Sequence, residues 1–141
     1  MDNKGFTLVE LIGVVLILII LIMYAVPKVS KLYKNSKKNT FLNNVNTIYN
    51  KSEDKRTENK LFDRPTQYIY SEDSTSLDLT GKKLYYCILF DEEKVVSLKV
   101  FDGKYYIEAN KNFDKLDISQ VKENELYKLE CNTKFREWCG W

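Results

Sequence analysis

A single carboxylate, Glu10, lies within an apolar stretch near the start of the chain. The stretch runs from Phe6 to Val26, and none of the other residues in these 21 is charged. A helix of this length, at about 1.5 Å per residue, matches the roughly 30 Å hydrocarbon core of a bilayer. Because placing a carboxylate in lipid costs roughly a few kcal/mol, an acid here predicts a functional site with a cationic partner.

The neighbouring sequence offers few cations to neutralise Glu10. The apolar stretch has no Lys, Arg or His, and the residues before it add only Lys4 and the terminal amine. A cut after Gly5 would create a new α-amino group on Phe6, at the start of the same helix. The chemistry that these residues favour is therefore proteolytic cleavage followed by pairing of two charges.

The string Gly5-Phe6-Thr7-Leu8-Val9-Glu10 resembles the prepilin cleavage motif of type IV pilins and pseudopilins. In that family a prepilin peptidase removes a short leader that ends in Gly, and the exposed residue, commonly Phe, is N-methylated. A Glu follows four residues later. Gly5, Phe6 and Glu10 match this motif residue for residue, and Pro27 matches a helix-breaking proline common in the family. The resemblance covers about the first 30 residues.

The resemblance implies an α+β fold, in which a long N-terminal helix packs on a small antiparallel sheet. The chain would divide into a leader (1–5), a transmembrane and assembly half of the helix (6–26), an amphipathic half (27–55) and a globular head (56–141). Before assembly it would be a single-pass membrane protein in the lipid bilayer, and afterwards part of an extracellular pilus filament. The implied partners are prepilin peptidase, an inner-membrane assembly platform, and copies of itself and other pilins.

The resemblance also implies roles for particular residues. Glu10 of an incoming subunit would neutralise the Phe6 ammonium of a neighbour within a low-dielectric bundle, so that one register is selected. Gly13 and Pro27 are weak points of the helix, and the segment between them would partly unwind as the subunit leaves the bilayer.

The sequence is compatible with more than one function. A pilus subunit and a pseudopilin of a type II secretion or competence system have the same N-terminal motif. The long region after the helix, and the lack of an aspartate cluster like the calcium loop of major secretion pseudopilins, favour the pilus. A membrane-anchored adhesion or binding module that never polymerises is the alternative from another class, with Glu10 near the lipid headgroups. An anchored enzyme is disfavoured, and no catalytic residue is assigned, because the chain has no His and no nucleophile constellation.

The cysteines and the overall charge limit other partners. Cys87, Cys131 and Cys139 lie beyond the span, and an odd count leaves one outside an intramolecular pair. Because type IV pilins often have a disulfide in their C-terminal region, the resemblance implies Cys131–Cys139 as the first pair, with Cys87 as the alternative partner. Three scattered thiols without His predict no metal site. A net charge of +2 predicts no specific nucleic-acid binding, and no motif predicts a cofactor.

A run of lysines follows the apolar stretch. No acidic residue occurs between Glu10 and Glu53. Taken alone, the positive-inside rule places this basic flank in the cytoplasm, opposite to the family topology. We follow the cleavage motif, because prepilin peptidase acts on the cytoplasmic face. The lysines are then either a solvated or headgroup-contacting helix face, or a surface that pairs with acids of a neighbouring subunit. They are Lys28, Lys31, Lys34, Lys37 and Lys38.

Apolar periodicity places the secondary structure. Steps of three and four residues from Val29 to Tyr49 predict an amphipathic helix that ends near Asn50 or Lys55. Lys51–Lys60 is charged without periodicity and predicts a frayed helix end or an exposed loop. A short strand is expected at Gln67–Tyr70.

Three segments rich in β-branched and aromatic residues predict an antiparallel meander: Lys83–Phe90, Lys94–Phe101 and Lys104–Ala109. Asp102-Gly103 predicts a two-residue hairpin turn. In the tail we expect a short helix at Ser119–Glu125 and a last strand at Leu126–Cys131.

Overall fold

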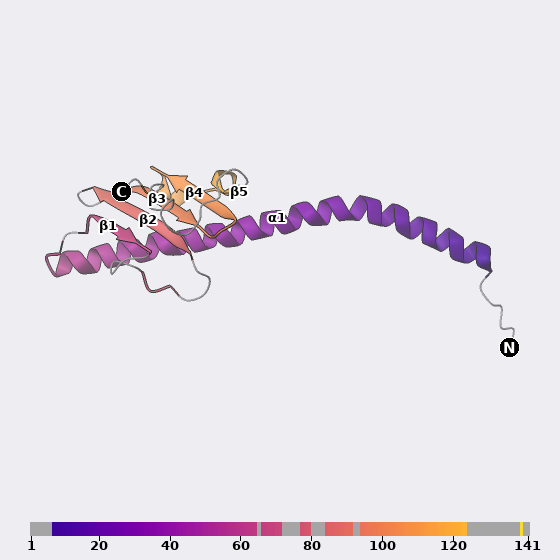
Figure 1. Ribbon diagram of the computed structural model, residues 1–141, viewed down its shortest axis with the longest axis horizontal. Helices are drawn as coiled ribbons and strands as arrows, with labels where there is room; N and C mark the ends of the chain where they lie inside the picture. Colours follow the sequence, from indigo (N-terminus) through magenta and orange to yellow (C-terminus); the bar gives the residue numbers. More distant parts are fainter. Residues whose placement is uncertain are drawn as a thin grey trace. The chain divides into compact units, whose positions relative to one another are not determined.

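The computed structural model describes residues 7–64, 66–71, 77–79, 84–91, 94–123 and 139. Contacts divide the chain into an N-terminal unit, Met1–Lys37, and a C-terminal unit, Lys38–Trp141. Helix α1, Leu8–Leu61, contributes its first part to one unit and its second part to the other. The C-terminal unit adds an antiparallel sheet, and this combination confirms the α+β class (Figure 1).

In the N-terminal unit α1 is a single helix that continues through Gly13 and Pro27. A Cβ atom built on Gly13 would meet no neighbouring atom within 4 Å, so packing does not require glycine there. Unwinding between Gly13 and Pro27 is a property of assembly and stays a prediction.

The end of α1 corrects the sequence-based expectation. The helix runs to Leu61, so the prediction of a frayed end or loop from Lys51 was wrong. Lys51–Lys60 lacks an apolar period, and local contacts between side chains and backbone stabilise the helix there. Ser52 is fully buried and donates to the Tyr49 carbonyl at 2.7 Å, while Arg56 pairs with Glu53 at 2.7 Å one turn apart. Such i,i+3 pairs stabilise a helix that hydrophobic periodicity alone does not reveal.

The helix terminates in a Schellman motif around Asp63, which has a left-handed φ of 55°. The Arg64 N–H donates to the Asn59 carbonyl at 2.9 Å, and the Asp63 N–H donates to the Lys60 carbonyl at 3.1 Å. This is the bonding pattern in which glycine is the preferred residue at the left-handed position. The C-cap is therefore a local site of backbone strain.

We expect Asp63→Gly to keep or raise stability and Asp63→Val to lower it by about 1–2 kcal/mol, because a β-branched side chain fits the left-handed conformation poorly. Chemical unfolding of the full chain in detergent micelles would measure both variants. Equal stability of the Gly and Val variants would contradict the assigned C-cap.

Within the described residues, the sheet has five antiparallel strands in sequence order, β1 to β5 (Figure 1). The central three strands confirm the expected meander, and β1 confirms the short strand near Gln67–Tyr70. The strands are β1 Tyr68–Tyr70, β2 Tyr85–Asp91, β3 Lys94–Phe101, β4 Tyr105–Ala109 and β5 Lys122–Glu123.

The main core lies between α1 and one face of the sheet. Phe41, Val45 and Ile48 recur on one side of α1 and are at most 1% exposed. They belong to one cluster with alternate residues of the strands, such as Ile88 and Leu98, which are fully buried. The second half of the helix therefore supplies the apolar stripe that the sequence predicts, and Figure 1 shows the strands along this part of α1.

The β3–β4 turn lies one residue later than predicted. The Asp102 N–H donates to the Tyr105 carbonyl at 3.1 Å, so Gly103 and Lys104 are the two loop residues. Gly103 has a φ of 98°, which favours glycine. The Asp102 carboxylate accepts from the N–H groups of Lys104 and Tyr105 at 2.9 and 2.7 Å. Asp102 thus stabilises the turn from outside the loop.

The part of the tail that the structure describes, up to residue 123, differs from the expectation. In place of the predicted helix at Ser119–Glu125, the chain forms a 3-10 turn at Ile118–Gln120 and then strand β5. Asp117 and Gln120 form a capping box around this turn. After the turn the chain becomes extended, because β5 pairs with Tyr105 and Tyr106 of β4. The predicted strand at Leu126–Cys131 lies outside the described residues.

Tyr86, on β2, has a buried hydroxyl that binds the backbone of Leu77. The Leu77 N–H donates to Tyr86 Oη at 2.6 Å, and Tyr86 Oη donates to the Leu77 carbonyl at 3.5 Å. Burial raises the pKa of Tyr86, because the phenolate would lose its hydration. The folded state therefore favours the protonated Tyr86 hydroxyl. The stability that this preference gives is fully present below the unfolded pKa of about 10, and it is lost as the pH rises toward the higher folded pKa.

We expect Tyr86→Phe to reduce the alkaline loss of stability. At pH 7 it should lower the free energy of unfolding by about 1–3 kcal/mol, because the Leu77 N–H loses its acceptor. Denaturant unfolding in micelles between pH 7 and the alkaline range measures both effects. Tyr33→Phe, at an exposed position, is the matched control. An unchanged alkaline slope in Tyr86→Phe would contradict the assignment.

Candidate functional site at the start of the long helix

Thr7 precedes helix α1 and caps it together with Glu10. The Glu10 N–H donates to Thr7 Oγ1 at 3.3 Å, while the Thr7 N–H donates to Glu10 Oε2 at 3.0 Å. The Thr7 hydroxyl also donates to Glu10 Oε2, at 2.8 Å. This reciprocal pattern is a capping box, in which a Thr before the helix and a Glu three residues later satisfy each other's backbone N–H groups.

The capping box gives Glu10 a structural partner within its own chain. A carboxylate in the first turn of a helix is also favoured by the partial positive charge of the helix N-terminus. Sequence reasoning missed Thr7, although Thr-x-x-Glu before an apolar run is a signal for a helix start. Among contacts with the described residues, the second oxygen of Glu10, Oε1, accepts no hydrogen bond, and the side chain is exposed.

Of the other site residues predicted on this helix, the structure describes Gly13 and Pro27. Gly5 and Phe6 lie outside the described residues, so cleavage, methylation and the charge pair stay predictions. Gly13 follows Glu10 by about one turn of α1, and Pro27 lies further along the same helix. The site that the structure describes consists of Thr7 and Glu10.

We expect Thr7→Val to loosen the first turn of α1, because it removes both the acceptor for Glu10 N–H and a donor to Glu10 Oε2. A capping residue contributes about 1 kcal/mol, so the amides of Glu10 and Leu11, which donate to the Thr7 hydroxyl and carbonyl, should exchange about fivefold faster. Residue-resolved hydrogen exchange of the full chain in micelles measures this. Thr7→Ser keeps the hydroxyl and should exchange like the parent chain. Equal rates in all three proteins would show that the box contributes nothing.

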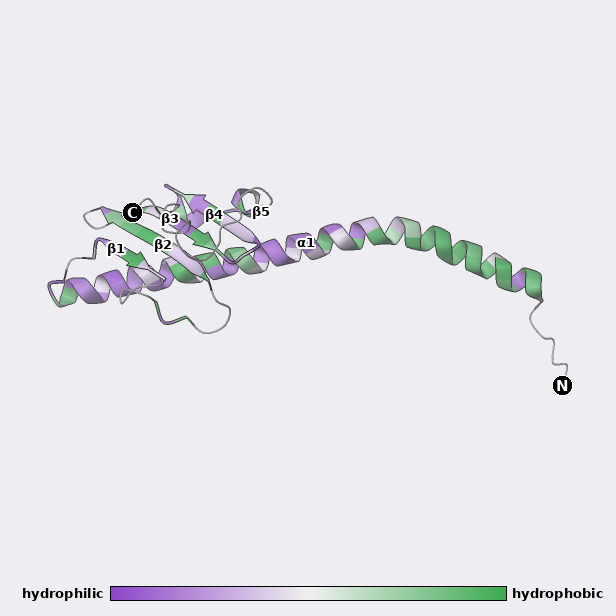
Figure 2. Cartoon of the chain, in the orientation of Figure 1, coloured by the Kyte–Doolittle hydropathy of each residue, from purple (hydrophilic) through white to green (hydrophobic). Residues whose placement is uncertain are grey.

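The surface that follows Glu10 along α1 is apolar and exposed. Every large apolar side chain from Leu8 to Val26 is at least 45% exposed. Figure 2 shows this part of α1 in green, and the hydrophilic residues lie further along the helix. By length and composition, α1 includes one segment long and apolar enough to span a membrane, and none of that segment is buried.

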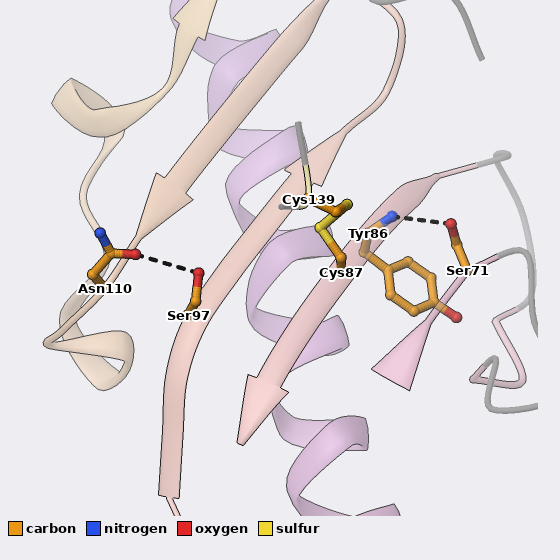
Figure 3. The surroundings of a disulfide bond; sticks show 6 residues. All are labelled: Ser71, Tyr86, Cys87, Ser97, Asn110 and Cys139. Carbon is orange, nitrogen blue, oxygen red and sulfur yellow. Dashed lines mark hydrogen bonds between the residues drawn. A yellow bond between two sulfur atoms is a disulfide. The ribbon is translucent and has the colours of Figure 1, made fainter. Parts of the chain in front are cut away.

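A disulfide joins Cys87 of β2 to Cys139, with the two Cα atoms 6.0 Å apart. The expected first pair, Cys131–Cys139, is therefore replaced by the alternative partner. The reason lies in strand parity: Cys87 and Tyr85 point to one face of β2, while Tyr86 and Ile88 point to the helix-packed face. Figure 3 shows the bond on the side of the strands away from the α1 ribbon.

The second face of the sheet has its own small cluster around this bond. Tyr70, Tyr85 and Phe101 are buried there, and Cys139 packs against them. The disulfide thus fixes a residue near the C-terminus on a surface that the helix does not cover. Cys131 lies outside the described residues.

Comparison with known proteins found no matching family model, no matching curated protein and no matching solved structure.

Proposed function

We propose that the chain is the precursor of a type IV pilin, a structural subunit that polymerises through its N-terminal helix into an extracellular filament. The observation that carries the proposal is the string from Gly5 to Glu10, which matches the prepilin motif and leads directly into an apolar helix. The α+β architecture, in which α1 packs on a small antiparallel sheet, is compatible with the pilin fold.

In the proposed pathway prepilin peptidase cuts between Gly5 and Phe6, and the new terminus is N-methylated. The apolar part of α1 holds the subunit in the bilayer as a single-pass protein until an assembly platform extracts it. Neighbouring copies, or other pilins, then pack their helices together. The exposed apolar surface between Leu8 and Val26 provides the area for lipid first and for other subunits afterwards.

The capping box supports a specific geometry for the charge pair. Oε2 of Glu10 receives two hydrogen bonds from Thr7, which leaves Oε1 for the Phe6 ammonium of a neighbour. A singly N-methylated amine keeps its positive charge and loses only one of its N–H donors, so methylation is compatible with this pair. In a dry helical bundle an unpaired ammonium is strongly disfavoured, so the pair would select one axial register.

The first experiment is intact-mass and N-terminal peptide analysis of the protein recovered from cells. A chain that starts at Phe6 with one added methyl group is the expected result. A chain that still begins at Met1, or is cut at another bond, would remove the main support for the proposal. Recovery in sheared surface filaments then separates a pilus subunit from a pseudopilin, because a short secretion or competence fibre is not shed in quantity.

One observation favours a second candidate, a membrane-anchored adhesion or binding module that does not polymerise. The capping box explains a Glu at position 10 without any neighbouring subunit. Such a module would keep its leader or lose it to signal peptidase. The same mass analysis therefore distinguishes the two candidates.

A further inference from the structure

Four lysines of α1 in the N-terminal unit have exposed ammonium groups and no acidic partner in the described part of the chain. These four lysines, here called the basic stripe, are Lys28, Lys31, Lys34 and Lys37. The contact that the structure shows for them is that of Lys37 Nζ with the Tyr33 ring, 5.2 Å from its centroid. Lys38 differs, because it is half-buried and donates to the Val121 carbonyl at 3.2 Å.

The helix cannot neutralise the basic stripe from within. The nearest acids in the sequence are Glu10 and Glu53. At about 1.5 Å per residue they lie roughly 27 Å before Lys28 and roughly 24 Å after Lys37 along the helix. Ion pairs within a helix form between residues three or four apart, so these acids are out of reach. Any anionic group that pairs with the basic stripe therefore lies outside this helix.

The basic stripe forms one face of an amphipathic segment of α1. With 3.6 residues per turn, steps of three residues distribute the four lysines over about half of the helix circumference. Val26, Val29 and Tyr33 lie on the opposite half, and all three are exposed, at 58%, 62% and 63%. A helix with a lysine-rich face and an apolar face, including an aromatic residue, is the form that lies at a membrane interface.

We propose that the basic stripe binds the phosphate groups of anionic phospholipids at the membrane surface beside the span. Lys28 follows Val26, the end of the apolar stretch, by two residues, so the surface is continuous with the span on the same helix. Lysines at this position reach the headgroups and gain about 1 kcal/mol each from an anionic surface, equivalent to about a fivefold effect per residue. Pro27 lies between span and basic stripe, where a helix bends most readily.

A second copy of the chain fits the basic stripe less well. The nearest acids on α1 after the basic stripe are interleaved with bases: Glu53 is paired with Arg56 at 2.7 Å, and Asp54 is next to Lys55. That face is mixed in charge and does not present a row of carboxylates. The lipid proposal rests on the membrane span of the proposed function but not on filament assembly.

Lysine labelling in vesicles tests the proposal. The full chain is reconstituted in phosphatidylcholine vesicles with and without phosphatidylglycerol, and acetylation rates of single lysines are measured by peptide mass spectrometry. Carbonate washing first confirms that the chain is inserted, so failure of the span is seen separately from failure of the basic stripe. Lys94, Lys111 and Lys115, which are exposed on the C-terminal unit, serve as internal references.

We expect phosphatidylglycerol to slow acetylation of the basic stripe about fivefold relative to the reference lysines, and added salt to reverse the effect. Inorganic phosphate with phosphatidylcholine alone should give no protection. Equal rates in both lipids would overturn the proposal. Protection by free phosphate would also overturn it, as would protection that depends on the number of copies per vesicle and not on the lipid.

A pair of variants provides the second measurement. The stripe variant changes all four lysines to Gln, and the matched control carries Lys94→Gln, Lys104→Gln, Lys111→Gln and Lys115→Gln, with the same change in charge. Native mass spectrometry from mixed micelles counts retained phosphatidylglycerol. The stripe variant should lose its preference for phosphatidylglycerol while the control keeps it. Equal retention by both variants would show that net charge, and not the basic stripe, attracts the lipid.

Discussion

If the chain assembles as proposed, Glu10→Val should leave it in the membrane and reduce filament yield by about a hundredfold or more. Valine fits the apolar span, so insertion is unaffected. Removal of one partner from a buried charge pair costs about 3–5 kcal/mol, and each 1.4 kcal/mol changes an equilibrium tenfold. The Phe6 ammonium of a neighbour would be left unpaired in the bundle. The measurement is the ratio of this protein in sheared filaments to that in the membrane fraction.

The capping box makes a sharper set of controls possible. Glu10→Gln keeps a side-chain oxygen for the Thr7 N–H but removes the charge, since Gln serves at this position of a capping box. Thr7→Val removes the box and keeps the charge. If charge pairing drives assembly, Gln should fail nearly as severely as Val, and Thr7→Val should retain most of its filaments. Normal assembly of Glu10→Gln would refute the charge pair and leave helix capping as the role of Glu10.

Cys87→Ser lowers the free energy of unfolding of the C-terminal unit by about 4 kcal/mol. The disulfide closes a loop with a sequence separation of 52 residues. Loop-closure entropy assigns about 4 kcal/mol to a loop of this length, because the cross-link restricts the unfolded chain. Total stability of a domain is about 5–15 kcal/mol, so this single bond contributes roughly a quarter to four fifths of it. Denaturant unfolding of the full chain in micelles provides the value.

Cys139→Ser should have the same effect as Cys87→Ser, and the double variant should be no worse than either single one. Cys131→Ser should preserve the Cys87–Cys139 link, which peptide mapping under non-reducing conditions would show. A loss of about 4 kcal/mol in Cys131→Ser with none in Cys87→Ser would contradict the assigned pairing.

Apolar periodicity predicted the helical part of the core because it records which face of a helix is buried, as in the three- and four-residue steps around Val45. The strand at Lys94–Phe101 was predicted from its β-branched and aromatic residues. The end of α1 was missed for the same reason. Lys51–Lys60 has no apolar period, and its helix depends on contacts such as Glu53–Arg56 that a hydrophobic pattern does not record.

The disulfide and the helix start were missed for different reasons. The pairing of Cys139 depends on which residues approach across a sheet face, and spacing along the chain does not determine that distance. The Thr7–Glu10 box could be read from the sequence. An acid in an apolar run predicts an external cation, whereas the Thr-x-x-Glu spacing predicts a local hydrogen-bond partner, and the structure shows the local one.

The Cys87–Cys139 bond also determines how the protein responds to mechanical force. When the chain is pulled from its two ends, the residues between these cysteines form a closed covalent loop and cannot be extended. At about 3.3–3.6 Å per residue, that loop withholds roughly 180 Å of contour length. A single-molecule pulling trace should therefore lengthen by this amount on reduction. Strands β3, β4 and β5 all lie within this closed loop and carry no load, so an oxidised chain under tension would extend without these three strands being pulled apart.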